Sequence, residues 1–522
     1  MSDPTPSVQD HNSNGPLAKE EPKDAEETTM HLGTDLEKDP MPSAGEAPYS
    51  VFSTTDKWIC LLLASSASIF STMGAPIYYP ALTIIESYFH VSEEMVNLSI
   101  VLYLSAQAIS PTLFAGFADA YGRRPVFIIC FVIFIAANIG LALVDNYNAL
   151  LVLRIIQSFG ISPTISIVNG LLGDITERKE RAGYVGIASG LRNTGQAFGS
   201  LLGAGLVSWF GWRGIFWFLA IAGFISFSAV LALLPETKRS IVGNGSITPK
   251  QIWNRAPVLY WGHYVRKWRL DRPRYDTLGE KSNIDFRQGL KILLVPELFV
   301  MLLNQALHYS LFCVCLTTLT TQLAKSYHYS VVKIGLCYLP CGFGGLIGAY
   351  VSGAVNNWNY KRRMDTFKQG QKDGTISSSK KFDIITTRLE TGIPMNIASN
   401  LFALMFGWCI NFKKNIALIN VSTFWVCFLS MAISAIVSTI LVDLYPSKGS
   451  GATSAMNLMR CGTAAIFIAV LSKMNQVMGV GGTVTFVSGI CLLSNATLIY
   501  PIKYAMKNAE VRNKKEQEKQ KE

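Results

Sequence analysis

The chain alternates between long apolar segments and short polar connections over most of its length. A bilayer core about 30 Å thick requires roughly 20 apolar residues per spanning helix, so uncharged runs of that length are candidate spans. Twelve such runs occur, at residues 58–85, 95–118, 125–144, 146–173, 182–212, 214–235, 298–324, 334–360, 391–412, 415–442, 449–472 and 474–502. The fourth, fifth and eleventh contain one arginine each, and the others no charge. The pattern predicts an all-α integral membrane protein with twelve transmembrane helices.

Composition agrees with embedding in a lipid bilayer. Half of the residues are hydrophobic and only 16% are charged, which is too little charge for a water-soluble surface. All ten cysteines lie in apolar stretches and none forms a CxxC pair, so we expect no disulfide, no metal site and no cofactor.

The basic residues predict the orientation of the chain. With both termini in the cytoplasm, the cytoplasmic segments hold 37 of the 46 lysines and arginines, the outer loops six and the helices three. The outer six are Arg213, Lys325, Lys333, Lys413, Lys414 and Lys473. The net charge of +11 is therefore a topology signal, and we expect a lipid bilayer rather than a nucleic acid as the partner.

The spans fall into two groups of six. We expect a disordered acidic tail at 1–55, a six-helix bundle at 56–235, a cytoplasmic linker at 236–295, a second six-helix bundle at 296–502 and a cytoplasmic tail at 503–522. The stretch from Glu236 to Lys291 carries twelve basic and five acidic residues, as suits a solvated linker near anionic lipid.

The two halves also repeat a spacing of residues. Asp119 and the turn at Gly122 follow the second span as Asn357 and Tyr360 follow the eighth. Arg192 follows Asp174 by eighteen residues, and Arg460 follows Asp443 by seventeen. Such repetition indicates duplicated six-helix units, the plan of many secondary transporters.

Three groups of residues carry candidate chemistry. Residues 115–125 are expected to form a tight turn, in which Gly122 permits the bend and the arginines keep the turn at the level of the lipid headgroups. The candidates for a gating loop are Asp119, Gly122, Arg123 and Arg124. Arg154 and Gln157 share a helix face with Gly160, and a membrane arginine needs a wet cavity or a partner. Glycines at a spacing of four, at Gly195, Gly199 and Gly203, create a flat face for close helix packing.

Each group also has a plainer interpretation. The turn can be an ordinary polar loop with positive-inside residues, Arg154 can be a structural arginine that snorkels, and glycine is generally frequent in membrane helices.

Taken together, the three groups resemble the major facilitator superfamily, and within it the fungal twelve-helix drug:proton antiporters. The segments 211–217, 234–246 and 333–340 resemble the quinidine-resistance branch. The resemblance implies export of drugs and metabolites, including weak organic acids or amino acids, from the plasma membrane. It further implies gating by the loop residues, proton-linked chemistry at Arg154 and Gln157, and packing at the three glycines.

The sequence departs from the family pattern at four positions. Ala115 and Ala120 stand where the loop usually has glycine and a basic residue, and Ser200 and Ala204 stand where the fifth helix usually has proline and glycine. These departures affect the direction of transport more than the fold.

Two further arginines and one histidine are candidates for the transport site. Arg192 and Arg460 occupy matching positions, roughly 12 Å into their helices, and we expect them to line a central cavity that disfavours strong cations. The alternative is that one or both snorkel to the inner headgroups or bond to neighbouring backbone carbonyls. His308 is the one histidine within a span, either as a proton carrier or as a packed side chain.

The leading hypothesis is a monomeric, proton-coupled exporter of small molecules that works by alternating access. No GxxxxGK[ST] segment is present, so ATP is not expected to drive transport from within the chain. A membrane-embedded enzyme would need an acid–base pair or a metal set, and the spans contain no carboxylate to form either. A sensor would need a signalling domain, and the tails are short and charged.

Overall fold

The computed structural model describes residues 49–260, 267–268, 274–279, 288–375, 382–444, 449–504 and 508. All regular secondary structure in these segments is helical. Most of the expected tails at 1–55 and 503–522, and part of the expected linker at 236–295, lie outside the described residues.

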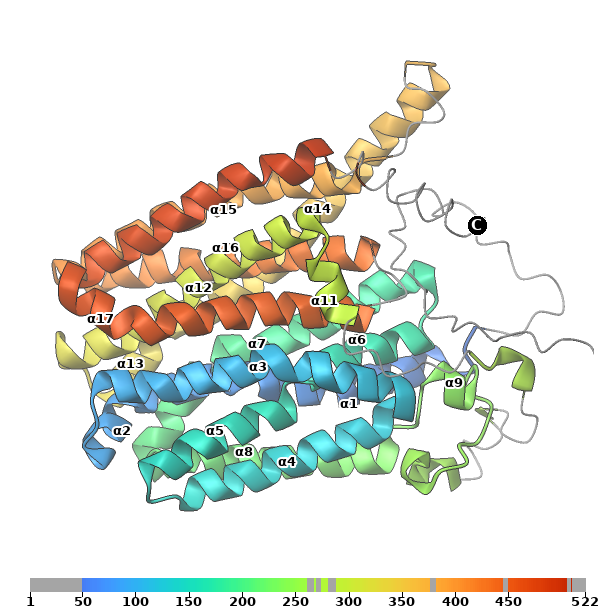
Figure 1. The fold of residues 1–522 in the computed structure, drawn as a ribbon, viewed down its shortest axis with the longest axis horizontal. Helices are drawn as coiled ribbons and strands as arrows, with labels where there is room; N and C mark the ends of the chain where they lie inside the picture. The colour runs from blue at the N-terminus through green and yellow to red at the C-terminus, as the bar shows by residue number, and fades with distance from the viewer. Residues whose placement is uncertain are drawn as a thin grey trace, which may run out of the picture.

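The helices run nearly parallel to one another along the long axis of the molecule (Figure 1). The first group comprises α1 Thr54–Met73, η1 Pro76–Ala81, α2 Leu82–Phe89, α3 Glu93–Tyr121, α4 Arg123–Leu143, α5 Tyr147–Ile161, α6 Thr164–Ile175, α7 Arg178–Phe210 and α8 Arg213–Leu233. The linker contributes short helical turns, namely α9 Arg239–Val242, η2 Ile252–Asn254, η3 Pro257–Tyr260, η4 Tyr275–Thr277 and α11 Gln288–Leu293. The second group comprises α12 Pro296–Lys325, α13 Val331–Cys337, α14 Leu339–Lys372, α15 Ile384–Asn411, α16 Ile416–Leu444 and α17 Gly449–Thr497.

Twelve membrane crossings result from these helices. Ten segments of the described chain are long and apolar enough to span a bilayer. The 33-residue α7 is an eleventh crossing; its charged first turn and Arg192 make it less apolar. The last segment, Ser450–Tyr504, reverses at Gly479, where φ is 69°, and so crosses twice. The predicted fold of twelve helices is confirmed.

Local sequence signals set several helix starts. Ser53 and Asp56 form a reciprocal capping box at α1, and the Ser92 hydroxyl accepts from the Met95 N–H at α3. Asn146 and Asp383 cap α5 and α15 in the same manner. Each cap satisfies a backbone N–H that has no partner within its helix.

Proline interrupts three of the predicted spans. The first breaks into α1, η1 and α2 around Pro76 and Pro80, the fourth breaks at Pro163, and the eighth breaks before Pro340. Proline lacks the backbone N–H and clashes with the preceding turn, so the helix bends or changes type there. Pro111, by contrast, lies within α3 without ending it.

The two groups of helices form two bundles that meet along a shared interface. Within the first, α1 packs on α7 and α4 on α8; within the second, α12 packs on α17 and α14 on α16. The interface is made chiefly by α3 against α17 and by α7 against α13 and α14. Figure 1 shows the linker segments α9 and α11 at the end opposite α2 and α13.

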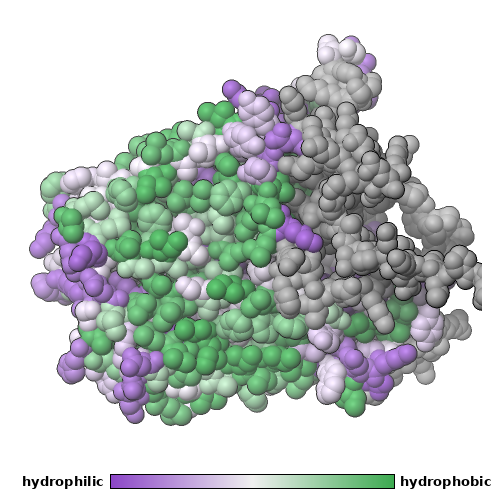
Figure 2. Space-filling model, viewed as in Figure 1, coloured by the Kyte–Doolittle hydropathy of each residue, from purple (hydrophilic) through white to green (hydrophobic). Residues whose placement is uncertain are grey.

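The surface carries an apolar band between two polar ends. Figure 2 shows hydrophobic side chains over the middle of the visible face and hydrophilic ones at its edges. Large apolar side chains on this surface include Trp209, Leu143 and Ile225, which are 83%, 64% and 65% exposed. Exposed apolar surface of this extent belongs in lipid.

Two details differ from the sequence prediction. The eighth span does not end at Tyr360, because α14 continues as one helix to Lys372 and projects beyond the bundle (Figure 1). The match between Gly122 and Tyr360 is therefore one of spacing and not of structure. The eleventh span also runs further than predicted, since the chain reverses at Gly479 and not at Lys473.

Candidate functional site

The turn between α3 and α4 holds a buried cluster of charges. The Arg123 guanidinium lies 2.8 Å from an Asp119 carboxylate oxygen and 3.0 Å from one of Asp174, at the end of α6. Lys238, just beyond α8, approaches Asp119 at 3.1 Å. The side chains of Arg123, Asp119 and Asp174 are 4%, 15% and 13% exposed, so water screens their charges little. The cluster joins α3, α4, α6 and the linker.

Glu236 is a site residue that sequence reasoning missed. Its carboxylate accepts from the backbone N–H groups of Arg123 and Arg124 at 2.9 and 3.1 Å, and so caps the N-terminus of α4. It also accepts from the N–H groups of Thr237 and Lys238, both at 2.9 Å. Burial raises the pKa of Glu236, and these four hydrogen bonds oppose the rise. The segment 234–246 contained the signal, because an isolated acid follows a proline there.

Arg124 has a different environment from its neighbour. Its guanidinium donates to the carbonyls of Val230, Leu231 and Leu234 at 3.1, 2.6 and 2.5 Å. These carbonyls lie at the C-terminal end of α8, where the helix dipole favours a cation. The Val230 carbonyl also accepts from the Leu234 N–H at 3.0 Å. Arg124 therefore fastens α8 to α4.

Two glycines permit the close approach of these groups. Gly122 has φ of 109°, and a Cβ there would lie 2.4 Å from a carboxylate oxygen of Glu236. A Cβ on Gly170 of α6 would lie 2.8 Å from the Arg123 guanidinium carbon. Any side chain at either position would displace the charged cluster.

Arg154 lies inside the first bundle. Its guanidinium is stacked between the rings of Tyr78 and Tyr103, 4.3 Å from each centroid, and is fully buried. It donates to the Gly74 carbonyl at 3.2 Å and to Gln157 at 2.7 Å. Arg154 therefore neither snorkels nor faces an open cavity, and instead holds the break between α1 and η1.

Gln157 extends this network to α4. Its amide nitrogen donates to Asn138 Oδ1 at 2.7 Å, and both side chains are fully buried. Arg154 also retains Nε and Nη2 groups that are buried without a partner. This part of the bundle is thus polar but rigidly connected.

The glycine face of α7 packs on the broken first span. A Cβ on Gly195 would lie 2.4 Å from the Ile69 carbonyl, and one on Gly203 would lie 2.1 Å from the Ile77 carbonyl. Gly199 is less constrained, with its nearest contact at 3.1 Å to Pro76. Backbone therefore lies directly against backbone along this face.

The structure explains the two departures in α7. Ser200 donates to the Pro76 carbonyl at 2.9 Å, which replaces the bond that Pro80 has no N–H to supply. Ala204 faces Gly335 of α13, where a Cβ would lie only 2.3 Å from the alanine Cβ. The glycine of this contact is thus Gly335 of the second bundle, and it leaves room for the Ala204 methyl group of the first.

Replacing Gly203 with alanine is expected to lower the melting temperature and reduce transport, because the new methyl group meets the rigid carbonyl of Ile77. Overpacking of this kind typically destabilises by roughly 1–3 kcal/mol. Gly205→Ala is the matched control, since a Cβ there has nothing within 4 Å. The measurement is thermal unfolding of both purified variants, and equal melting temperatures would contradict the packing argument.

Arg192 and Arg460 lie close together at the interface of the bundles. Arg192 of α7 and Arg460 of α17 are near enough for their like charges to repel each other. Arg460 is stacked on Tyr309 of α12 at 4.6 Å and donates to Asn457 at 2.8 Å. Arg192 donates to Ser189 at 3.4 Å. Neither forms an ion pair with a described residue, so this region is electropositive.

His308 lies within the second bundle. Its side chain is 1% exposed, and Nε2 lies 3.3 Å from Asn495 Oδ1 on the last helix. The next residue, Tyr309, is the one that stacks on Arg460. His308 is therefore one residue away from the interface without being part of it.

Polar contacts close the interface toward both ends of the molecule. Toward the linker end, Ser166 and Asn169 of α6 bond to Ser454 and Thr453 of α17 at 2.9 and 2.7 Å. At the opposite end, Lys325 of α12 pairs with Glu86 and Glu93 of the first bundle at 3.1 and 2.8 Å. The cavity between α7 and α12, α14 and α16 has a volume of about 10 Å³, and is lined by residues that include Asn193, Gln196, Phe312 and Tyr338. The bundles are closed upon each other in this conformation.

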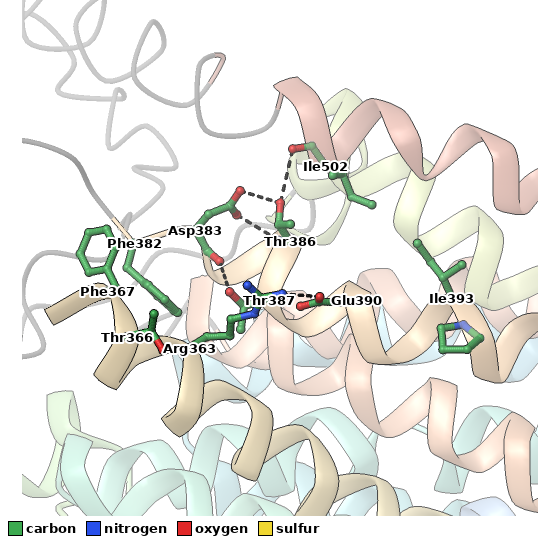
Figure 3. Close-up of a pocket in the computed structure, with 11 residues that line it drawn as sticks. Arg363, Thr366, Phe367, Phe382, Asp383, Thr386, Thr387, Glu390, Ile393 and Ile502 are labelled. Carbon is green, nitrogen blue, oxygen red and sulfur yellow. Dashed lines mark hydrogen bonds and ion pairs between the residues drawn. The ribbon is translucent and has the colours of Figure 1, made fainter. Parts of the chain in front are cut away.

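A larger cavity, of about 560 Å³, lies apart from these residues. It is formed by the projecting part of α14, the start of α15 and Ile502 (Figure 3). Its polar groups already have partners, because Arg363 pairs with Glu390 and Asp383 caps α15 by accepting from the Thr386 N–H at 3.0 Å. No three His, Cys, Asp or Glu side chains of the described segments are grouped as a metal site.

Comparisons with known proteins identify relatives over nearly the whole chain. A family model described as "Major Facilitator Superfamily" matches residues 64–469. The chain is 40% identical to the "Multidrug transporter AQR1" of Candida glabrata, covering 95% of this chain and 84% of that protein. It is 39% identical to the "MFS antiporter QDR2" of Candida albicans, covering 92% and 94%. Among solved structures it is similar to the human organic anion transporter MFSD10, with a TM-score of 0.51, 15% identity and coverage of 87% and 100%, which supports the fold alone.

Proposed function

The chain belongs to the major facilitator superfamily, and we propose that it exports drugs or small organic metabolites in exchange for protons. The observation that carries this proposal is the identity of about 40% to fungal proteins named as multidrug transporters and antiporters, over more than nine tenths of the chain. It is a multi-pass membrane protein, and its substrates are small molecules.

The closed interface supports alternating access. The bundles are joined toward one end by the hydrogen bonds of Ser166 and Asn169 to α17, and at the other end by the ion pairs of Lys325. These contacts can break and reform without unfolding either bundle. Opening the Lys325 end exposes the region of Arg192 and Arg460 to one side, and opening the Ser454 end exposes it to the other.

We assign the gating role to the charged cluster around Arg123. It links the ends of three helices to the linker, and these groups must separate or shift when the first bundle rocks. Asp119 and Gly122 belong to the same unit. Arg124 and Glu236 position the ends of α8 and α4 beside it.

The electropositive interface favours anionic or neutral substrates. Arg192 and Arg460 place two positive charges where the bundles meet, with no described carboxylate paired to either. An exporter of weak organic acids or amino acids is accordingly the preferred form of the proposal. The Tyr309 ring beside Arg460 supplies an apolar face for an aromatic substrate.

A membrane-embedded enzyme fits the site less well. Four carboxylates of the first bundle lie at helix ends, where they pair with basic residues, namely Asp119, Asp174, Glu86 and Glu93. His308 bonds to an amide instead of an acid. Acid–base chemistry within the membrane would need two titratable groups in reach of one substrate.

The remaining parts of the proposal concern location and assembly. We propose residence in the fungal plasma membrane, with both termini in the cytoplasm and the Lys325 end outside. The two bundles of one chain enclose the proposed transport site between them, so we propose that the protein works as a monomer.

The proposed function is tested with the purified full-length protein in liposomes that have an acidic lumen and a neutral bath. A proton gradient of this direction is expected to drive accumulation of aromatic carboxylates, and to a smaller extent of permanently charged amines, above the level in protein-free liposomes. The reason is that outward proton flow is exchanged for substrate entry. A protonophore should abolish the difference. Absence of accumulation for every compound tested, with correctly folded protein, would contradict the proposal.

A further inference from the structure

The second bundle contains a buried polar cluster that the transport interface does not use. Asn304 of α12 donates to Ser494 Oγ at 2.8 Å and to Asn495 Oδ1 at 2.9 Å. Asn396 of α15 donates to Asn304 Oδ1 at 3.0 Å. With His308 on Asn495, the cluster joins three helices. Asn304, Asn396, Ser494 and His308 are at most 8% exposed, and Asn495 is partly buried.

The hydrogen bonds fix the direction of each amide. The Ser494 hydroxyl donates to the Cys491 carbonyl at 2.7 Å, so its oxygen must accept from the Asn304 nitrogen. That same nitrogen donates to Asn495, so the Asn495 atom that faces it is the oxygen. This oxygen is also the atom that faces His308.

The direction of the amides decides the tautomer of His308. Because Asn495 Oδ1 can only accept, His308 Nε2 carries the hydrogen and donates across 3.3 Å. In the neutral ring, Nδ1 is then a bare lone pair. Nδ1 is buried and has no partner, as are Asn396 Oδ1 and Asn495 Nδ2. A buried polar atom left without a partner is destabilising, so its presence in the folded protein calls for an explanation.

The position of His308 suits a group that exchanges protons with both sides. It lies twelve residues into α12, roughly 18 Å from the cytoplasmic end and so near the middle of the bilayer. Asn495 is its hydrogen-bond partner, and the imidazole takes part in none of the ion pairs of the described residues. The carboxylates at Asp119 and Glu86 are committed to ion pairs at opposite ends.

We propose that Nδ1 of His308 is the binding site of the coupled proton. The inference rests on the proposed function of proton-coupled export. A proton from the outer side adds to the Nδ1 lone pair and converts the neutral imidazole to imidazolium; it leaves from the same nitrogen to the cytoplasm, and no covalent bond of the chain breaks. Asn396 Oδ1 is an unpartnered acceptor in the same cluster.

The neighbouring residue couples this site to transport. Tyr309 follows His308 on α12 and stacks on Arg460 at the interface. A new charge on the imidazole changes how α12 packs against α15 and α17, and therefore moves the ring that contacts Arg460. Proton binding and substrate binding are thereby linked through one helix.

The test compares His308→Gln with wild type in the liposomes described above. Glutamine keeps a donor toward Asn495 but does not titrate. Exchange of substrate at equal pH is expected to persist in the variant, while accumulation driven by the proton gradient falls to the level of protein-free liposomes. His328→Asn is the control for loss of a histidine, because His328 lies outside the spans with φ of 54°, which asparagine tolerates.

A second variant keeps the proposal testable if glutamine prevents folding. Asn495→Asp is nearly isosteric and breaks no bond of the cluster, because Asn495 Nδ2 has no partner. The added carboxylate should stabilise the imidazolium and raise the midpoint pH of proton release on substrate addition, measured with a pH dye.

The outcomes separate the two proposals. Gradient-driven accumulation that survives in His308→Gln, or an unchanged midpoint in Asn495→Asp, overturns the role of His308 and leaves export intact. Wild-type exchange that ignores the gradient overturns proton coupling itself.

Discussion

Arg123→Ala is expected to lower substrate efflux by about tenfold or more while the amount of protein in the membrane stays near normal. The substitution leaves Asp119 and Asp174 buried, with Lys238 remaining near one of them. Removing one partner of a buried ion pair typically costs about 3–5 kcal/mol. Even half of that shifts a two-state equilibrium by about tenfold. Asp119→Ala acts on the same pair and should have a similar effect.

Two further variants show whether the effect belongs to the cluster. Lys361→Ala removes an exposed basic residue at the same end of the molecule, and should transport like wild type. Arg124→Ala removes the three bonds that end α8, so its expected defect is a lower amount of folded protein. The measurement is efflux per molecule at the membrane. Normal efflux by Arg123→Ala would exclude the gating role.

Arg192→Gln and Arg460→Gln are each expected to reduce the preference for an aromatic carboxylate over a quaternary amine. At an effective dielectric constant of about 20, two unit charges roughly 8 Å apart interact by about 2 kcal/mol. Removing one arginine charge is therefore expected to change the ratio of carboxylate affinity to amine affinity by about tenfold or more, while the remaining arginine preserves part of the preference. In Arg460→Gln the Arg192 guanidinium should also be less destabilised, because the repulsion by the Arg460 charge is removed.

The preference is measured by competition between the two compounds for exchange at equal pH, which removes the proton gradient from the comparison. Arg362→Gln is the matched control, because this exposed arginine stacks on Trp358 on the projecting part of α14. An unchanged ratio in both Arg192→Gln and Arg460→Gln would show that these charges do not select the substrate.

The repetition of residues predicted one of these sites better than the other. Arg192 and Arg460 were expected to line one cavity because matching helix positions lie on opposite walls of a shared site, and the structure brings their charges within range of each other. Their role in selecting substrates stays a prediction. The repeated spacing at Asn357 and Tyr360 has no structural counterpart to the turn at Gly122, because α14 runs past the predicted end of the span to Lys372. The polar side chains there suit a helix that leaves the membrane as well as a loop.

Arg154 illustrates what its sequence position left open. A charge within an apolar run must be satisfied, and a wet cavity and a protein partner both meet that requirement. The partner is a pair of tyrosines from α3 and the broken first span. Neither tyrosine is close to Arg154 in sequence, so periodicity could not identify them.

Glu236 and the cluster around His308 have the same cause. Glu236 caps α4 from 112 residues away, and Asn495 faces His308 from 187 residues away. Short-range patterns do not contain such separations. Which nitrogen of His308 carries the hydrogen, and therefore that Nδ1 is the one left without a partner, depends further on the orientation of the Asn304 and Asn495 amide groups.

The sequence by itself determined the class of this protein: the number of crossings, the two bundles and the family follow from apolar length, the placement of charge and the local motifs. These properties depend on the bilayer, which every apolar segment meets in the same way. The tertiary structure alone decided which charges pair, that Ser200 replaces a bond lost at Pro80, and which nitrogen of His308 is free. Those properties depend on contacts between distant helices, where a single hydrogen bond decides whether a buried group is satisfied.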